Sequence, residues 1–279
     1  MNPWNPATLR PKLADAAKRL HIGLSQAQLL LAQERFLARL AGIKEGKHFV
    51  WKGGSLVLRR YSRLKIPRYT ADIDLLASGL KISQVESAFK KAMEVDLDDG
   101  FSFSGISKTE MERDTPYGGD RYEIGWRLFK RPGSEILRVD VCTGDDVDPE
   151  QVSGRDVFLV DDEKEAVTVL VYPPEFVFAE KLETMVRFKT GNTRFKDFID
   201  MWNLIQLPLS TETTREAVQR CFERRGTPLS PKKWHEILGD KEFQELMETV
   251  RGRKHASMEL PAVDQIFKEI GRFLVSIEK

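Results

Sequence analysis

Apolar residues recur at helical spacing near the start of the chain. One such segment covers residues 7–20, and a second runs from Ser25 to the glycine at position 42. An apolar stripe that repeats about every 3.6 residues predicts a helix with one buried face. We expect these two helices to cover a protein core, and a surface for a partner is the alternative.

Further along, short segments alternate between apolar and polar residues or are continuously apolar, and turn residues bound each of them. Such patterns predict β-strands. The predicted strands cover residues 48–51, 101–111, 122–128, 135–143, 158–160 and 167–171, another opens at Asp72, and a helix is predicted over 83–95. The acidic residues at 96, 98 and 99 precede a glycine, which predicts a solvated turn.

Helical patterns dominate after Pro173. The sequence predicts helices over residues 175–189 and 193–205, and two or three more between 210 and 279. This change places a domain boundary between residues 1–172 and residues 173–279. The predicted fold class is therefore α/β, with a core built on a mixed β-sheet followed by a helical C-terminal domain.

The composition is that of a soluble globular protein, with 41% hydrophobic and 31% charged residues in a chain of 279. The formal net charge of +1 gives no overall preference for nucleic acid, so such binding would depend on local clusters. Cys142 and Cys221 lie far apart and predict neither a disulfide framework nor a zinc site. No apolar run approaches the ~20 residues of a membrane helix, and the first residues lack the apolar core of a signal peptide. We therefore expect a cytoplasmic protein that does not bind a membrane.

Two aspartates open the strand that follows the glycine-rich turn. Alternate residues of a strand point to the same face, so Asp72 and Asp74 are expected side by side. Adjacent carboxylates repel each other unless a cation lies between them. Hard oxygen ligands suit Mg²⁺, which commonly shares its coordination shell with phosphates.

The preceding turn provides for a phosphate. Gly53 and Gly54 let the backbone come close, and the helix that begins near Ser55 offers free N–H groups. Basic residues follow at Arg59, Arg60, Arg63, Lys65 and Arg68. They either form a solvated helix end or neutralise a triphosphate or an RNA backbone, and Arg68 is the candidate nucleotide ligand among them.

Other candidate residues lie later in the chain. On the predicted strand 135–143, Asp140 stands between valines, where an aspartate is out of place unless it serves a function. The alternative is an aspartate at a strand end that pairs with Arg138. The nearby acidic residues Asp145, Asp146 and Asp148 are rivals that are typical of turns.

A second charged group lies on the first two helices of the C-terminal domain. Lys181 lies on the flank of an apolar stripe, where a lysine extends to solvent or meets an anion. Asp197 and Asp200 are one helical turn apart and project together. The alternative is two surface helices with salt bridges such as Lys196 to Asp200.

These strings together resemble a known family. KGGS followed by R-x-T-x-DIDL resembles the AbiEii/AbiGii toxin branch of the nucleotidyltransferase superfamily, and EKLETMVRFKTGNTRFKDFIDMWNL resembles the second signature of that branch. The resemblance implies a nucleotidyltransferase core, with the nucleotide in a cleft between the core and the helical domain. Sixteen residues separate Ser55 from Asp72, more than is usual in the family, and a longer loop around residues 65–67 would absorb them.

The resemblance also implies roles for individual residues. Asp140 would be a third metal-binding carboxylate and would take the proton of the attacking hydroxyl. Lys181 would bind the phosphates of the nucleotide, and Asp197 or Asp200 would orient it.

The implied activity is metal-assisted transfer of a nucleoside monophosphate from a nucleoside triphosphate to an acceptor hydroxyl. Asp72 and Asp74 would hold Mg²⁺, or Mn²⁺ in its place. The resemblance points to the 3′ end of tRNA as acceptor. It also implies that the protein is the toxin of a toxin–antitoxin or phage-defence pair, with the antitoxin encoded by a neighbouring gene. A small molecule or a protein hydroxyl as acceptor is one alternative, and a non-catalytic nucleotide- or RNA-binding module is another. Basic clusters at residues 220–233 and 251–254 are either solvated or contact RNA.

Overall fold

The structure is a computed structural model. It describes residues 4–64, 68–111, 119–129, 133–145, 147–156, 158–159, 167–255 and 258–278. The chain divides into two compact units, one of residues 1–60 and 69–172 and the other of residues 61–68 and 173–279. The loop at 65–67, Asp146 and Val160, each named above, lie outside the described residues.

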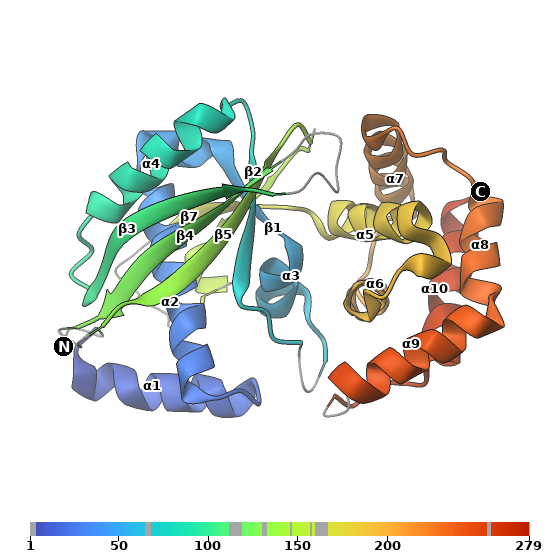
Figure 1. Ribbon diagram of the computed structural model, residues 1–279, viewed down its shortest axis with the longest axis horizontal. Helices are drawn as coiled ribbons and strands as arrows, with labels where there is room; N and C mark the ends of the chain where they lie inside the picture. Colours follow the sequence, from blue (N-terminus) through green and yellow to red (C-terminus); the bar gives the residue numbers. More distant parts are fainter. Residues whose placement is uncertain are drawn as a thin grey trace. The chain divides into compact units, whose positions relative to one another are not determined.

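Within the described residues, seven strands of the first unit form one sheet in the order β3-β4-β5-β2-β1-β7-β6 (Figure 1). The strands are β1 (Phe49–Lys52), β2 (Asp72–Ala77), β3 (Phe101–Glu110), β4 (Gly119–Leu128), β5 (Glu135–Thr143), β6 (Glu150–Ser153) and β7 (Thr168–Val171). The β1–β7 and β2–β5 pairs are parallel, and the other neighbouring pairs are antiparallel. The sheet is therefore mixed, and the predicted α/β fold class is confirmed.

The helices of the first unit pack around this sheet. They are α1 (Pro6–Arg19), α2 (Leu24–Ala41), α3 (Gly53–Leu56) and α4 (Ile82–Glu94), with a π-helical turn η2 (Val57–Tyr61) after α3 and 3₁₀ turns η1 (Lys44–His48) and η3 (Gly154–Asp156). Helices α2 and α4 lie along one face of the sheet (Figure 1). There the ring of Phe89 on α4 lies 5.2 Å from that of Phe36 on α2 and 5.0 Å from that of Tyr122 on β4, centroid to centroid. This aromatic cluster fills the core on that face.

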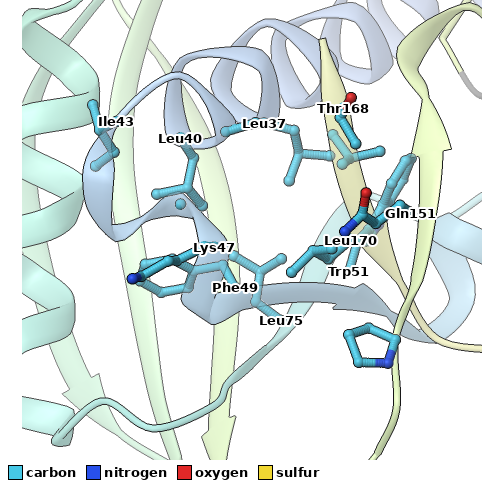
Figure 2. Close-up of a pocket in the computed structure, with 14 residues that line it drawn as sticks. Leu37, Leu40, Ile43, Lys47, Phe49, Trp51, Leu75, Gln151, Thr168 and Leu170 are labelled. Carbon is cyan, nitrogen blue, oxygen red and sulfur yellow. The ribbon is translucent and has the colours of Figure 1, made fainter.

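A pocket of about 590 Å³ opens on the same face, between α2 and the strands β1, β6 and β7 (Figure 2). Leu37 and Leu40 line it from α2, and Trp51 and Leu75 line it from the sheet. Trp51 pairs with Leu75, and the next pair along the strands is formed by Lys52 and Asp74. Because successive strand residues point to opposite faces, the pocket lies across the sheet from Asp74.

The second unit is helical in its described part. It contains α5 (Pro174–Phe188), the 3₁₀ turn η4 (Lys189–Gly191), α6 (Phe195–Leu204), α7 (Thr211–Arg225), α8 (Pro231–Gly239), α9 (Lys241–Lys254) and α10 (Val263–Ile277). Phe198 of α6 packs against Phe243 of α9 and Phe267 of α10, at centroid distances of 5.8 and 4.8 Å. Four helices follow α6, where the sequence predicted two or three, because α8 and α9 are separated by the single residue Asp240. None of the described helices is both long enough and apolar enough to cross a membrane.

The predicted strand at 158–160 is wrong over its described residues. Phe158 and Leu159 are not in a strand, and the backbone N–H of Leu159 donates instead to the side chain of Glu34, at 2.9 Å. The partner of β7 at this edge is β6, which the sequence did not predict. The sequence of β6 is short and polar and does not alternate clearly between apolar and polar residues. It forms a strand because the edge of β7 offers backbone N–H and C=O groups for pairing.

The predicted solvated turn holds for Asp96 and Asp98, which are exposed, but is wrong for Asp99, which is fully buried at 0% exposure. Arg35 donates to its carboxylate at 2.6 Å and Arg39 does so twice at 2.7 Å. These two arginines lie on adjacent turns of α2, so both side chains reach the same carboxylate. A buried arginine needs a carboxylate, and the fold brings Asp99 to two of them.

Candidate active site

The central strands bring four charged residues into one row across the sheet, called the charged row below. Lys52 of β1 lies opposite Asp74 of β2, and Asp74 lies opposite Asp140 of β5. Arg121 of β4 lies opposite Asp140 on the other side. Residues directly opposite one another share a face of the sheet, so a basic residue ends the row on each side of two carboxylates. Asp72, two positions before Asp74, faces the same way.

The glycine turn touches this row. Gly53 has a left-handed backbone, with φ of +71°, and a Cβ there would lie 2.0 Å from Asp74 Oδ2. Only glycine leaves room for the Asp74 carboxylate against the turn. Gly53 and Gly54 are partly exposed, whereas Ser55 is buried and its Oγ accepts a hydrogen bond from Trp51 Nε1 at 2.8 Å. The backbone of the turn is therefore the part beside Asp74, and the Ser55 hydroxyl is bonded within the core.

Arg121 binds the third carboxylate. Its Nε and Nη2 donate to the two oxygens of Asp140, each at 2.7 Å, and its Nη2 lies 3.8 Å from Asp72 Oδ2. The hydrogen bonds to Asp140, with the charges of Asp140, Asp72 and Asp74, raise the pKa of Arg121 above its usual value. The sequence missed Arg121 because the predicted strand began one residue after it. The only sign was its period-two spacing from Glu123, a residue that faces the same way.

The alternative pairing of Asp140 with Arg138 is wrong. Arg138 donates instead to Glu123 of β4, at 2.9 Å. This second pair lies one step along the same face from Arg121 and Asp140, since Arg138 is opposite Glu123 in register.

Lys52 was also missed, although it begins the KGGS string. Its Nζ lies 2.9 Å from Asp145 Oδ2, and the Tyr172 hydroxyl donates to the same oxygen at 3.0 Å. The Lys52 side chain is 8% exposed. Asp145 thus holds a buried lysine, whereas Asp148 is exposed.

The basic residues after the turn are bonded to acids. Arg59 and Glu34 are each 1% exposed and pair at 2.9 Å, and Arg60 pairs with Glu150 at 2.9 Å. Burial raises the pKa of Glu34 to about 6, although Arg59 opposes the shift. Neither predicted role of the basic cluster, a solvated helix end or a phosphate ligand, therefore holds for Arg59.

The predicted residues of the second unit form a buried ionic cluster. Lys181 Nζ lies 2.7 Å from Asp200 Oδ2 and 3.2 Å from Asp197 Oδ1. Arg68 donates twice to Asp200, at 3.1 and 2.8 Å, and Arg194 donates to Asp197 at 2.7 Å. Burial alone would lower the pKa of Lys181, but the charges of Asp200 and Asp197 outweigh it and raise that pKa. Burial opposes the shift of Asp197, and the charges of Lys181 and Arg194 lower its pKa to about 2.

This cluster contradicts the interpretation of α5 and α6 as surface helices. Asp197 and Asp200 are 3% and 2% exposed. Asp200 pairs with Lys181 and Arg68, where the alternative expected Lys196. The sequence predicted that Asp197 and Asp200 project together. Their contacts with Lys181, and the contact of Arg194 with Asp197, are additions from the structure.

Comparison with known proteins then decides the family. The model of the nucleotidyl transferase AbiEii toxin, of type IV toxin–antitoxin systems, matches residues 35–269. The chain belongs to the AbiEii nucleotidyltransferase toxin family. It is therefore a nucleotidyltransferase, as its motifs predicted. No curated protein matches the sequence significantly.

One solved structure shows the same fold at low identity, and two more resemble the chain less closely. JHP933 from Helicobacter pylori is 11% identical, with a TM-score of 0.52 over 91% of each chain. A candidate nucleotidyltransferase from H. pylori is 12% identical, with a TM-score of 0.49 over 91% of this chain and 94% of that one. An antigenic nucleotidyltransferase-like protein from Paracoccidioides brasiliensis is 14% identical, with a TM-score of 0.38 over 70% of this chain and 90% of that one.

The family implies a divalent metal, and the charged row fits one in part. Among the described residues, no three His, Cys, Asp or Glu side chains come close enough together to hold an ion. Asp72 and Asp74 offer oxygen ligands on one face, which suit Mg²⁺ or Mn²⁺. Asp140 does not fit while Arg121 holds both its oxygens. The two aspartates of β2 are therefore the fitting ligands, and Asp140 can join them only if Arg121 moves.

Some basic residues of the second unit also have acidic partners. Arg225 donates to Glu183 at 3.0 Å and to Glu180 at 2.7 Å. Arg251 donates to Glu248 at 2.6 Å. These two arginines are held by carboxylates, so the basic clusters offer RNA less charge than their count implies.

Proposed function

We propose that this protein transfers a nucleoside monophosphate from a nucleoside triphosphate to the 3′ end of tRNA, in a reaction that needs Mg²⁺ or Mn²⁺. The observation that carries the proposal is the close approach of the Gly53 backbone to Asp74. A Cβ placed on Gly53 would lie only 2.0 Å from Asp74 Oδ2. A phosphate held by the turn would lie beside a carboxylate suited to a metal. That juxtaposition is what nucleotidyl transfer requires.

In the proposed reaction, the acceptor hydroxyl attacks the α-phosphorus, a new O–P bond forms, and the bond to pyrophosphate breaks. Asp72 and Asp74 would hold the metal, which when bound would stabilise charge on the phosphate oxygens. Backbone N–H groups of the turn would donate to the phosphates. Asp140 is the candidate acceptor of the hydroxyl proton once its oxygens are free of Arg121.

The predicted role of Lys181 at the phosphates is part of the proposal. Asp197 and Asp200 hold its ammonium group on two sides, at 3.2 and 2.7 Å, which fixes its position. A lysine so buried would keep its charge for an anion, because its carboxylates raise its pKa. We propose that the two aspartates act through Lys181, as positioning residues.

The tRNA acceptor and the antitoxin follow from the family and not from the charged row. A toxin that blocks the 3′ end of tRNA would stop translation, so the cell would need an antitoxin that counteracts it. The net charge of +1 gives the acceptor no further support.

A labelling assay tests the proposal. The protein would be incubated with Mg²⁺, each α-labelled ribonucleoside triphosphate in turn, and total tRNA. Asp74→Asn keeps the shape of the side chain and removes its charge. Glu123→Gln is the matched control, because Glu123 is a carboxylate on the same sheet face outside the charged row. We expect label on tRNA from one nucleotide, lost in Asp74→Asn and retained in Glu123→Gln.

Other results would identify an alternative. Label on the protein itself would make a protein hydroxyl the acceptor. Binding of a nucleotide without label on any macromolecule would favour a small-molecule acceptor or a non-catalytic binding module. Equal labelling by Asp74→Asn and the native protein would refute the proposed site.

A further inference from the structure

Arg121 binds Asp140, the candidate third metal ligand. It holds both oxygens of Asp140 at 2.7 Å and lies 3.8 Å from Asp72. The positive charge of Arg121 therefore neutralises the three carboxylates as a metal ion would. Carboxylates gathered on one face repel one another, and an arginine among them removes that repulsion without a metal.

The exposure of this pair makes it exchangeable. The side chains of Arg121 and Asp140 are 40% and 16% exposed. Exposed ion pairs are worth roughly 0–1 kcal/mol, and the two hydrogen bonds of this pair place it toward the upper end of that range. A divalent ion can therefore compete with it. The buried pair of Arg35 and Asp99, at 2% and 0% exposure, is the opposite case and serves the core.

We propose that Arg121 is a positioning residue that competes with the metal for Asp140. This inference rests on the proposed function. With no metal, Arg121 holds Asp140 in place beside Asp74. A metal that takes Asp140 as its third ligand must first displace the guanidinium, so Arg121 keeps the affinity for metal low.

Once displaced, Arg121 is a cation that has lost its two hydrogen bonds to Asp140. The phosphates of a nucleotide are the anions that would satisfy it there. Arg121 thereby favours a metal that arrives with its nucleotide over a metal alone.

Titration with Mn²⁺ alone tests the inference, because the electron paramagnetic resonance signal of free Mn²⁺ reports binding without any reaction. The variant is Arg121→Gln. The control is Arg127→Gln, which removes an exposed arginine from the same strand and face, six residues from Arg121 and opposite Ser102 of β3. Arg138 is unsuitable as a control because it lies opposite Asp72. A unit charge beside a divalent ion, even screened as in water, changes affinity about tenfold.

We expect Arg121→Gln to bind Mn²⁺ about tenfold tighter than the native protein, and Arg127→Gln to stay within about twofold of it. Arg121→Lys, which keeps the charge but not the paired hydrogen bonds, should lie between them. Adding Asp140→Asn to Arg121→Gln should abolish the gain, which a merely structural role of Arg121 would not predict.

Equal affinity in the native protein and Arg121→Gln would overturn the inference, as would no Mn²⁺ binding to either. An equal gain in Arg127→Gln would reduce the effect to overall charge and overturn the inference as well. Thermal unfolding of each variant shows that it is folded. Unchanged affinity with tRNA labelling intact would refute the role of Arg121 alone. Tighter Mn²⁺ binding with no labelling would refute the proposed function alone.

Discussion

Replacing Gly53 with alanine is the sharpest test of the site. The new Cβ would lie 2.0 Å from Asp74 Oδ2, 2.5 Å from Cγ and 2.7 Å from Cβ. Because even the Asp74 Cβ is too close, rotating that side chain does not relieve the collision. The backbones of β1 and β2 must move apart at the pair formed by Lys52 and Asp74.

Two costs add in this variant. A residue with a Cβ in the left-handed region costs about 1–2 kcal/mol. Overpacking costs about 1–3 kcal/mol more. Gly105→Ala is the matched control, because Gly105 has φ of +69° and nothing within 4 Å of its Cβ position. The control carries the first cost and not the second.

The assay is thermal unfolding alongside tRNA labelling. We expect Gly53→Ala to be less stable than Gly105→Ala by about 1–3 kcal/mol. Its labelling rate should fall about 100-fold, since a carboxylate displaced by about 1 Å misplaces the reacting groups. The labelling rate of Gly105→Ala should be that of the native protein. Equal stability and equal labelling in the two variants would refute the contact of the turn with Asp74.

Two further predictions concern stability. The pKa of Asp197 is about 2 when folded and 3.8 when free, so its contribution is complete above pH 3.8 and is lost as the pH falls toward 2. In urea titrations, the free energy of unfolding of the native protein should fall by about 2 kcal/mol between about pH 4 and pH 2 because of this group. This part of the pH dependence should be absent in Asp197→Asn. Glu34→Ala should cost about 3–5 kcal/mol, because it leaves Arg59 buried without its carboxylate. Glu86→Ala, whose partner Lys90 is exposed, should cost less than about 0.5 kcal/mol in the same denaturation measurement.

The sequence by itself determined most of the local elements, though not β6, and it determined the family. The predicted strand at 135–143 matches β5 at both ends. Period-two alternation also placed Asp72 and Asp74 on one face, because side-chain direction along a strand is a local property. The motif strings gave the family, and helical spacing brought Asp197 and Asp200 to one side of α6.

Only the tertiary structure decided which basic residue pairs with which carboxylate. Arg121 and Asp140 are 19 residues apart, Arg39 and Asp99 are 60 apart, and no local pattern links either pair. Alternation tells which face a side chain takes, but its neighbour on that face depends on the register between strands. Register is set by packing of the whole sheet against α2 and α4, so the charged row exists only in the folded chain.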